Sequence, residues 1–277
     1  MKLSRFKYWF SFTVLLAIVA LYSLPILFML SGSLKPDDKV LSDVGSVFAL
    51  IPRDVSLQNY RDVFNRVPFA QYMFNSLFIS AMVVFSGLVV NSLAAYSLAR
   101  LRWRGRTLIL NLILAVMILP LEAIVVPLFY QVSLFGWLDS YFVQILPFIA
   151  NAFSIYLFYT FFVGLPREFE EAAYLDGATS LRTFTSIVVP NSKPVFASVA
   201  VLSFLTQWSA FIWPLMVTHS EGVRPLALAI STFYTLPPLQ WGDIFAFGVM
   251  MVTPVLVLFL MFQSWFVKGV AASAIKG

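Results

Sequence analysis

Long runs without a charged residue constrain the fold of this sequence more than any other feature. Only 11% of the 277 residues are charged, against about 25% in an ordinary soluble domain. A helix needs about 20 mostly apolar residues to cross a bilayer. Six stretches reach this length, so the sequence predicts an all-α membrane protein with a single transmembrane domain over residues 1–277. The predicted transmembrane helices lie at about residues 9–31, 72–99, 108–130, 141–163, 195–218 and 244–267.

The same composition excludes several classes of protein. A soluble fold of this length cannot cover its surface with so few charges, which excludes a soluble enzyme, a disordered chain and a nucleic-acid-binding protein. The sequence has no cysteine and one histidine, His219, which we expect in a loop. A disulfide framework, a zinc cluster, a catalytic thiol and a histidine-based metal site are therefore excluded. We expect no catalytic residue and no metal ligand in this chain.

The distribution of lysine and arginine predicts the orientation of the chain. With the N-terminus inside, twelve of the eighteen basic residues fall on the inner side, including the cluster from Arg100 to Arg106. The positive-inside rule then places both termini in the cytoplasm. The first apolar run is too long for a cleavable signal peptide, so we expect it to remain as the first helix. Residues 32–70 form the largest outside loop, and residues 164–193 form an inside loop.

The inside loop has the residues of two short helices joined by a tight turn. Pro166 and the acidic residues after it are typical of a helix N-terminus, because proline has a helical φ and acids interact favourably with the helix dipole. Gly177 suits the left-handed position that ends a helix. Thr179 or Ser180 is expected to cap a second helix, which we expect Pro190 to close. A loop that packs only against its own helices is the alternative interpretation.

Residues in this loop resemble the signature of ABC importer permeases. Residues 171–173 (EAA) and 176–178 (DGA), with Ile187, Pro190 and Pro194, follow the pattern E-A-A…D-G-A…I…P…P. Residues 74–77 (FNSL), 93–100 (LAAYSLAR) and 127–130 (PLFY) are similar to the carbohydrate-importing branch, which includes the G-type permease of maltose systems. The resemblance runs from about residue 31 to residue 277. It implies a multi-pass protein of a prokaryotic inner (plasma) membrane.

The resemblance also implies partners and a role for the inside loop. The loop would be the coupling helix, which seats in a cleft of a cytoplasmic ATPase. Two copies of that ATPase would use ATP and Mg²⁺, since this chain has no G-x-x-x-x-G-K-[ST] loop and is expected to bind no cofactor and to be no enzyme. A second permease subunit, forming a heterodimer, and an extracytoplasmic solute-binding protein are the other implied partners, within membrane lipid and without nucleic acid. The matching coupling residues are Glu168, Glu171, Ala172, Ala173, Leu175, Asp176 and Gly177.

Candidate residues of a solute path lie in the third and fifth predicted helices. Glu122 follows Arg106 by about 16 residues, which is roughly 24 Å along a continuous helix, in the outer half of the membrane. An acid within the membrane is by default a functional residue, and its alternative role is to pair with a partner subunit or reach the membrane surface. Trp208 and Trp213, beside Ser209, are candidates to stack on a sugar ring, although packing residues look the same in sequence. Relatives often have Asn and Asp where Ser209 and Ala210 stand.

Two other classes of function remain to be weighed. An ion-coupled secondary transporter usually has several ionisable groups within the membrane and an internal repeat, and here Glu122 is alone and no clear repeat is present. An intramembrane enzyme would need a histidine, cysteine or paired-carboxylate cluster within the spans. The sequence therefore favours one permease subunit of an ATP-driven ABC importer, which forms half of the path of a sugar or sugar-like solute.

Overall fold

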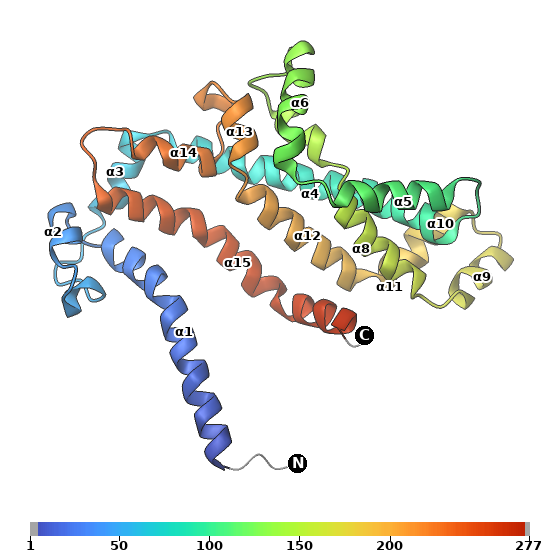
Figure 1. Cartoon of the computed structure of the whole chain (residues 1–277), viewed down its shortest axis with the longest axis horizontal. Coiled ribbons are helices and arrows are strands. Elements are labelled where there is room, and N and C mark those ends of the chain that lie inside the picture. The colour runs from blue at the N-terminus through green and yellow to red at the C-terminus, as the bar shows by residue number, and fades with distance from the viewer. Residues whose placement is uncertain (1–4, 275–277) are drawn as a thin grey trace. The chain divides into compact units, whose positions relative to one another are not determined.

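The computed structural model describes residues 5–274, with the side chains of residues 7–263, and this range contains helices and no strand (Figure 1). The all-α fold class is confirmed. The helices are α1 (Arg5–Ser33), α2 (Asp37–Ser42), η1 (Val47–Ala49), α3 (Gln58–Arg66), α4 (Phe69–Arg100), α5 (Arg106–Met117), α6 (Leu121–Leu134), α7 (Tyr141–Ile145), η2 (Leu146–Phe148), α8 (Ala152–Val163), α9 (Glu168–Leu175), α10 (Ser180–Thr183), η3 (Phe184–Val188), α11 (Val189–Asn191), α12 (Lys193–Trp208), α13 (Ile212–Val217), η4 (Glu221–Val223), α14 (Leu226–Phe233) and α15 (Trp241–Ala274).

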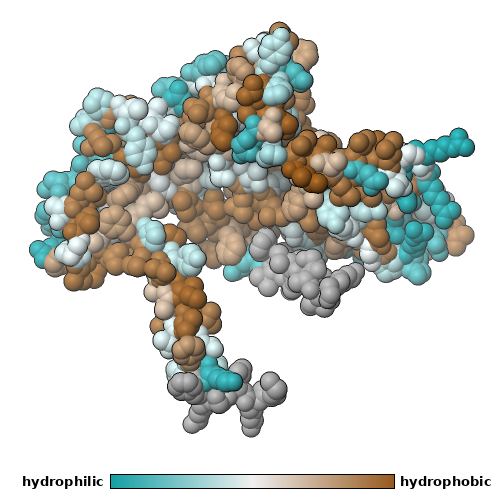
Figure 2. All heavy atoms as spheres, viewed as in Figure 1, coloured by the Kyte–Doolittle hydropathy of each residue, from teal (hydrophilic) through white to brown (hydrophobic). Residues whose placement is uncertain are grey.

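Some of these helices are long and apolar enough to span a membrane by themselves. In two further pairs, the helices are bent at a short break and are long and apolar enough to span a membrane only when both helices of the pair are taken together. Counting each bent pair as one span raises the number within the described residues from four to six, the number predicted. Figure 2 shows apolar side chains along α1, whereas hydrophilic side chains gather where α9 and α10 lie. The four single helices are Lys7–Ser33, Phe69–Arg100, Tyr141–Val163 and Trp241–Gln263.

The third predicted span is broken rather than continuous. α5 ends at Met117, α6 begins at Leu121, and the two helices meet at an angle of 102°. Pro120 lies at the break with an extended backbone (φ −70°, ψ 147°). A proline has no N–H to donate to the preceding turn and disfavours a helical residue before it, so α5 cannot continue through this position. The depth estimated for Glu122 from a continuous helix is therefore wrong.

The fifth predicted span, residues 195–218, is also interrupted. α12 ends at Trp208, and the separate short helix α13 begins at Ile212. The bent pair that passes the span test consists of residues Ser180–Asn191 and α12, which meet at 81°. Pro190 does not close the second loop helix as predicted. It lies in the first turn of α11, where a missing N–H is tolerated, and the chain turns at Ser192 instead.

The chain divides into two compact units, and the larger one, Gln71–Leu228 with Val255–Gly277, contains the loop predicted to be inside. α8 packs against α5 and α12 in this unit. A cluster of buried aromatic and aliphatic side chains joins α4, α8, η3 and α12 next to that loop. Burial of this apolar area stabilises the helices around the loop. The cluster consists of Ala95, Tyr96, Leu98, Ala99, Ile155, Phe158, Phe162, Phe184, Val188, Val195 and Val199.

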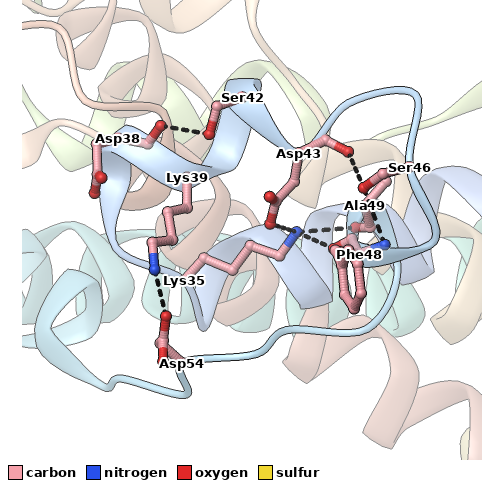
Figure 3. Close-up of polar contacts among 9 residues, drawn as sticks. All are labelled: Lys35, Asp38, Lys39, Ser42, Asp43, Ser46, Phe48, Ala49 and Asp54. Atoms are coloured by element: carbon pink, nitrogen blue, oxygen red, sulfur yellow. Dashed lines mark hydrogen bonds and ion pairs between the residues drawn. The ribbon is translucent and has the colours of Figure 1, made fainter.

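The other unit, Met1–Ala70 with Ala229–Pro254, contains the predicted outside loop. The Lys35 side chain is 2% exposed, and its ammonium group lies 3.2 Å from the Asp43 carboxylate (Figure 3). It also donates hydrogen bonds to the carbonyl oxygens of Phe48 and, at 3.4 Å, Ala49. A buried charge is stable only when paired and hydrogen-bonded, so Lys35 holds α2 and η1 together around it. The loop is thus an ordered structure.

A second buried ion pair orders the same unit. Arg66, the last residue of α3, donates to the Asp243 carboxylate at 2.7 Å and to the Gln240 side chain at 3.0 Å. It also donates to the carbonyl oxygens of Leu236 and Pro238, at 3.0 and 2.8 Å. Arg66 therefore attaches α3 to the start of α15. Neither ion pair could be predicted from the sequence. Arg66 and Asp243 lie far apart in the chain, and Lys35 and Asp43 lie in a loop with many other charges.

Candidate coupling loop and solute path

The first helix of the loop predicted to be inside forms as expected and ends on glycine. Three acidic residues occupy the first turn of α9. Gly177 has φ +78°, the left-handed conformation that glycine adopts without strain. The Gly177 N–H donates to the Tyr174 carbonyl at 3.0 Å, and the Ala178 N–H donates to the Ala173 carbonyl at 2.9 Å. These two bonds make a Schellman motif, which satisfies the last carbonyl groups of α9 and sets the turn.

The second helix of the loop begins at the predicted cap. Thr179 accepts a hydrogen bond from the Arg182 N–H at 3.4 Å, and α10 follows it. The helix then widens into the π-helical stretch η3 before α11. Buried Phe184 and Val188 of η3 belong to the core cluster described above. The loop is therefore packed against the helices beside it on one side.

The predicted coupling residues divide between two faces of α9. Of the predicted residues, Leu175 is 90% exposed, and Phe169, a residue of α9 outside the predicted set, is 54% exposed. Ala173 is buried, at 7% exposed, so its side chain packs within its own unit rather than facing a partner as the sequence analysis assumed. The helical period explains the difference, because Ala173 lies three residues after Glu170, and these two buried residues of α9 share one face of the helix. The predicted residues left exposed are Glu168, Glu171, Ala172, Leu175, Asp176 and Gly177.

Two contacts attach the inner face of α9 to the end of α4. The Arg100 Nε lies 3.1 Å from the Glu170 carboxylate, and a terminal nitrogen of Arg100 donates to the Leu165 carbonyl at 2.6 Å. One turn away on both helices, the hydroxyl groups of Tyr96 and Tyr174 lie 3.4 Å apart. We call Tyr96, Arg100, Glu170 and Tyr174 the α4–α9 tether. Both members of the ion pair are buried, with side chains 3% and 9% exposed.

The electrostatics of Glu170 follow from this burial. Burial raises the pKa of the Glu170 carboxyl above its ordinary value, and the attraction of Arg100 and Arg167 offsets part of that rise. Sequence analysis assigned Arg100 only to the orientation of the chain and did not select Glu170. The signal available in the sequence was a spacing of four residues between Tyr96 and Arg100 and again between Glu170 and Tyr174, which places each pair on one face of its helix.

Glu122 lies in the first turn of α6, immediately after the break at Pro120. Its side chain is exposed, and it makes no ion pair with any side chain that the structure describes. The N-terminal end of a helix favours a negative charge, so the position itself stabilises the carboxylate. Glu122 is thus open to solvent, to lipid or to a partner.

The two candidate tryptophans are packing residues in this structure. Trp213 is 1% exposed, and its indole N–H donates to the Val143 carbonyl at 3.0 Å. It lies in a buried cluster with Val125 of α6, three residues after Glu122. Trp208 is 5% exposed and stacks on Phe204, with ring centroids 5.2 Å apart. Neither ring has an open face for a sugar, which supports the alternative that the sequence analysis left open.

Ser209 lies at the break between α12 and α13. Its side chain is exposed, and its hydroxyl donates to the Leu205 carbonyl at 2.8 Å. His219, beyond α13, is in a loop where its N–H and that of Ser220 donate to the Asp139 carboxylate at 2.9 and 2.8 Å. The described side chains include no group of three or more histidine, cysteine or acidic residues able to hold a metal ion.

Comparisons with known proteins agree with one another. Residues 87–272 match the family described as binding-protein-dependent transport system inner membrane component. The arabinooligosaccharides transport system permease protein AraQ of Bacillus subtilis (strain 168) is 33% identical over 93% of this chain and 92% of its own length. The trehalose/maltose transport system permease protein MalG of Thermococcus litoralis is 30% identical over 95% of this chain and 94% of its own length.

A solved structure matches the whole fold. It is the crystal structure of a bacterial ABC transporter involved in the import of the acidic polysaccharide alginate. The match has a TM-score of 0.84 at 28% sequence identity and covers 96% of this chain and 99% of the other.

Proposed function

Because the chain belongs to the family of binding-protein-dependent transport system inner membrane components, we propose that it is one of two permease subunits of an ATP-driven importer of oligosaccharides. The relatives named for arabinooligosaccharides, trehalose/maltose and alginate support a sugar-like solute. A second permease completes the path, two cytoplasmic ATPase subunits use ATP and Mg²⁺, and an external binding protein delivers the solute. This chain hydrolyses nothing. An ion-coupled transporter is not supported by the family.

The observation that carries this proposal is the division of α9 into an exposed face and a tethered face. Leu175 and Phe169 are large apolar side chains on a short amphipathic surface, and exposed apolar groups of this kind favour a protein partner. The opposite face is fixed to α4 by the α4–α9 tether. When the ATPase subunits close, movement of α9 is transmitted to α4, which changes access to the path from one side of the membrane to the other.

The breaks between α5 and α6 and between α12 and α13 support the position of the solute path. Non-helical backbone at membrane depth is tolerated only where it is buried in protein or lines a water-filled cavity. Ser209 is exposed at one break, and Glu122 is exposed beside the other. Hydroxyl and carboxylate oxygens bind the hydroxyl groups of a sugar. We therefore retain Glu122 and Ser209 as path residues and assign Trp208 and Trp213 to packing.

The experiment is ATP-dependent uptake of labelled oligosaccharides by vesicles that contain the complete complex. Wild-type vesicles should accumulate the solute only with ATP inside and the binding protein outside. Leu175→Glu places a charge on the exposed face of α9, and we expect it to release the ATPase from the purified complex and abolish uptake. Leu41→Glu is the matched control, because Leu41 is an exposed leucine of α2 in the other unit. Retention of the ATPase by Leu175→Glu would contradict the coupling surface, and uptake without ATP would contradict the proposed function.

A further inference from the structure

A cleft of about 400 Å³ lies at the junction between α4 and α5, beside the start of α9. Its walls come from the end of one membrane helix, the start of the next and the residue before α9. Four of the eight lining residues are arginines. The lining residues are Arg100, Arg102, Trp103, Gly105, Arg106, Thr107, Leu108 and Arg167.

Most of the positive charge in this cleft has no acidic partner. Arg100 forms an ion pair with the buried Glu170 carboxylate, and this charge is therefore not available to the other arginines. Arg102, Arg106 and Arg167 form no ion pair with any described side chain, although Arg106 donates to the Leu101 carbonyl at 3.3 Å. Like charges gathered in one cavity repel one another, and a bound anion would remove that repulsion.

The backbone adds to the same field. Gly105, with φ +90°, is the N-cap of α5, and the next three residues, which also line the cleft, lie in the first turn of the helix, where backbone N–H groups have no partner within the helix. No side chain caps this helix end. The positive end of the helix dipole therefore points to the space that the arginines surround, and arginines bind phosphate through paired N–H donors. Charge and geometry both select an anion of phosphate type.

The surroundings of the cleft identify the carrier of that phosphate. The cleft lies where two candidate membrane segments end, and Leu108 and Leu112 on α5 are 64% and 52% exposed. Trp103, in the same wall, is 41% exposed, and its indole N–H donates to the Ser97 carbonyl at 3.3 Å. Tryptophan is enriched at the level of lipid headgroups, and the exposed leucines suit acyl chains. A free phosphate would use the arginines but not this apolar wall.

We propose that this cleft binds the phosphate of an acidic phospholipid headgroup. Arg102 and Arg167 provide the charge, the start of α5 provides N–H donors, and the acyl chains lie along Leu108 and Leu112. Basic pockets between membrane helices on the cytoplasmic side bind acidic headgroups in this way. The inference rests on the proposed orientation, which places this junction inside. A lipid in the cleft contacts both α5 and the residue that precedes α9, so it supports the coupling loop from the membrane side.

The test is native mass spectrometry of the complete complex, taken from phosphatidylcholine vesicles that contain phosphatidylglycerol. The wild-type complex should retain phosphatidylglycerol in preference to phosphatidylcholine. Arg102→Gln and Arg167→Gln should each weaken that retention roughly fivefold, the effect of one basic residue near a membrane surface. Arg104→Gln is the matched control, since Arg104 is an exposed arginine of the same connection that does not line the cleft, and it should retain the lipid normally.

Three outcomes would overturn the assignment. Equal lipid loss in Arg104→Gln would mean that diffuse surface charge holds the lipid. Displacement of the lipid by inorganic phosphate, with equal binding of inorganic phosphate in detergent, would make the site one for free phosphate. Retained phosphatidylglycerol with loss of the ATPase in Arg102→Gln would assign the cleft to that partner. Because ATPase retention is measured on the same samples, failure of lipid binding is distinguished from failure of the proposed function.

Discussion

Asp139 shows how one partly buried side chain orders a connection between helices. It has φ +56°, and its carboxylate accepts hydrogen bonds from the N–H groups of His219 and Ser220. These bonds, with the Ser220 backbone contributing most, lower the pKa of Asp139 below its ordinary value. The carboxylate therefore stabilises the fold at pH values above the unfolded pKa of about 3.9, and this contribution is lost as the pH falls through the lower folded pKa.

We expect Asp139→Asn to remove the pH-dependent part of this stabilisation while keeping a carbonyl acceptor and a residue that tolerates positive φ. Asp139→Ala should lower stability by about 1 kcal/mol at pH 7, a value reduced for the partial exposure of the site. Thermal unfolding of the purified chain in detergent at pH 7 and at about pH 2, well below the unfolded pKa, measures both effects. An alanine variant as stable as wild type at pH 7 would show that the two hydrogen bonds add nothing.

Glu122→Gln tests the solute path at the same scale, because it keeps the shape of the side chain and removes its charge. As a path residue, Glu122 should accept a hydrogen bond from a sugar hydroxyl, and the variant should bind solute about fivefold more weakly, because a neutral amide makes a hydrogen bond roughly 1 kcal/mol weaker than a carboxylate does. Uptake at varied solute concentration measures this change in vesicles with equal amounts of complex. Lower yield of the complex with unchanged uptake per complex would assign Glu122 to contact with a partner subunit.

At the scale of elements, the α4–α9 tether predicts how the coupling loop is held. Removal of one member of a buried ion pair costs about 3–5 kcal/mol, because the other charge remains buried, whereas replacement of both by apolar residues is often tolerated. We expect Arg100→Met and Glu170→Met to lower the unfolding temperature of the complex. The double variant should recover it but transport less solute per ATP hydrolysed.

The control for this experiment is Tyr174→Phe, which removes a single long hydroxyl contact. It should change neither the unfolding temperature nor the solute transported per ATP by much. The ratio of uptake to hydrolysis in vesicles separates coupling from stability. If the double variant is stable and transports with the wild-type ratio, the tether has a structural role alone. The tether could not be predicted from the sequence, because Arg100 and Glu170 lie far apart in the chain and only the tertiary structure brings them within 3.1 Å of each other.

At the scale of the whole molecule, the uneven distribution of basic residues predicts that Ser46 and Ser180 lie on opposite sides of the membrane. The chain has no cysteine, so Ser46→Cys and Ser180→Cys each introduce one unique thiol. A membrane-impermeant thiol reagent added to intact cells should label the first variant and label the second only after the membrane is opened. The parent chain provides the unlabelled control. Labelling of both thiols in intact cells would contradict two cytoplasmic termini.

The sequence by itself determined the membrane class, the helical fold and the two-helix form of residues 164–193, because apolar run length, proline and glycine positions and cap residues act locally. It did not determine where a span breaks or which face of a short helix is buried. Pro120 and residues 209–211 interrupt helices that length alone joins, Ala173 is buried on one face of α9, and Trp213 is buried by neighbours distant in sequence. Only the tertiary structure decided these points, since burial and ion pairing depend on which helices meet.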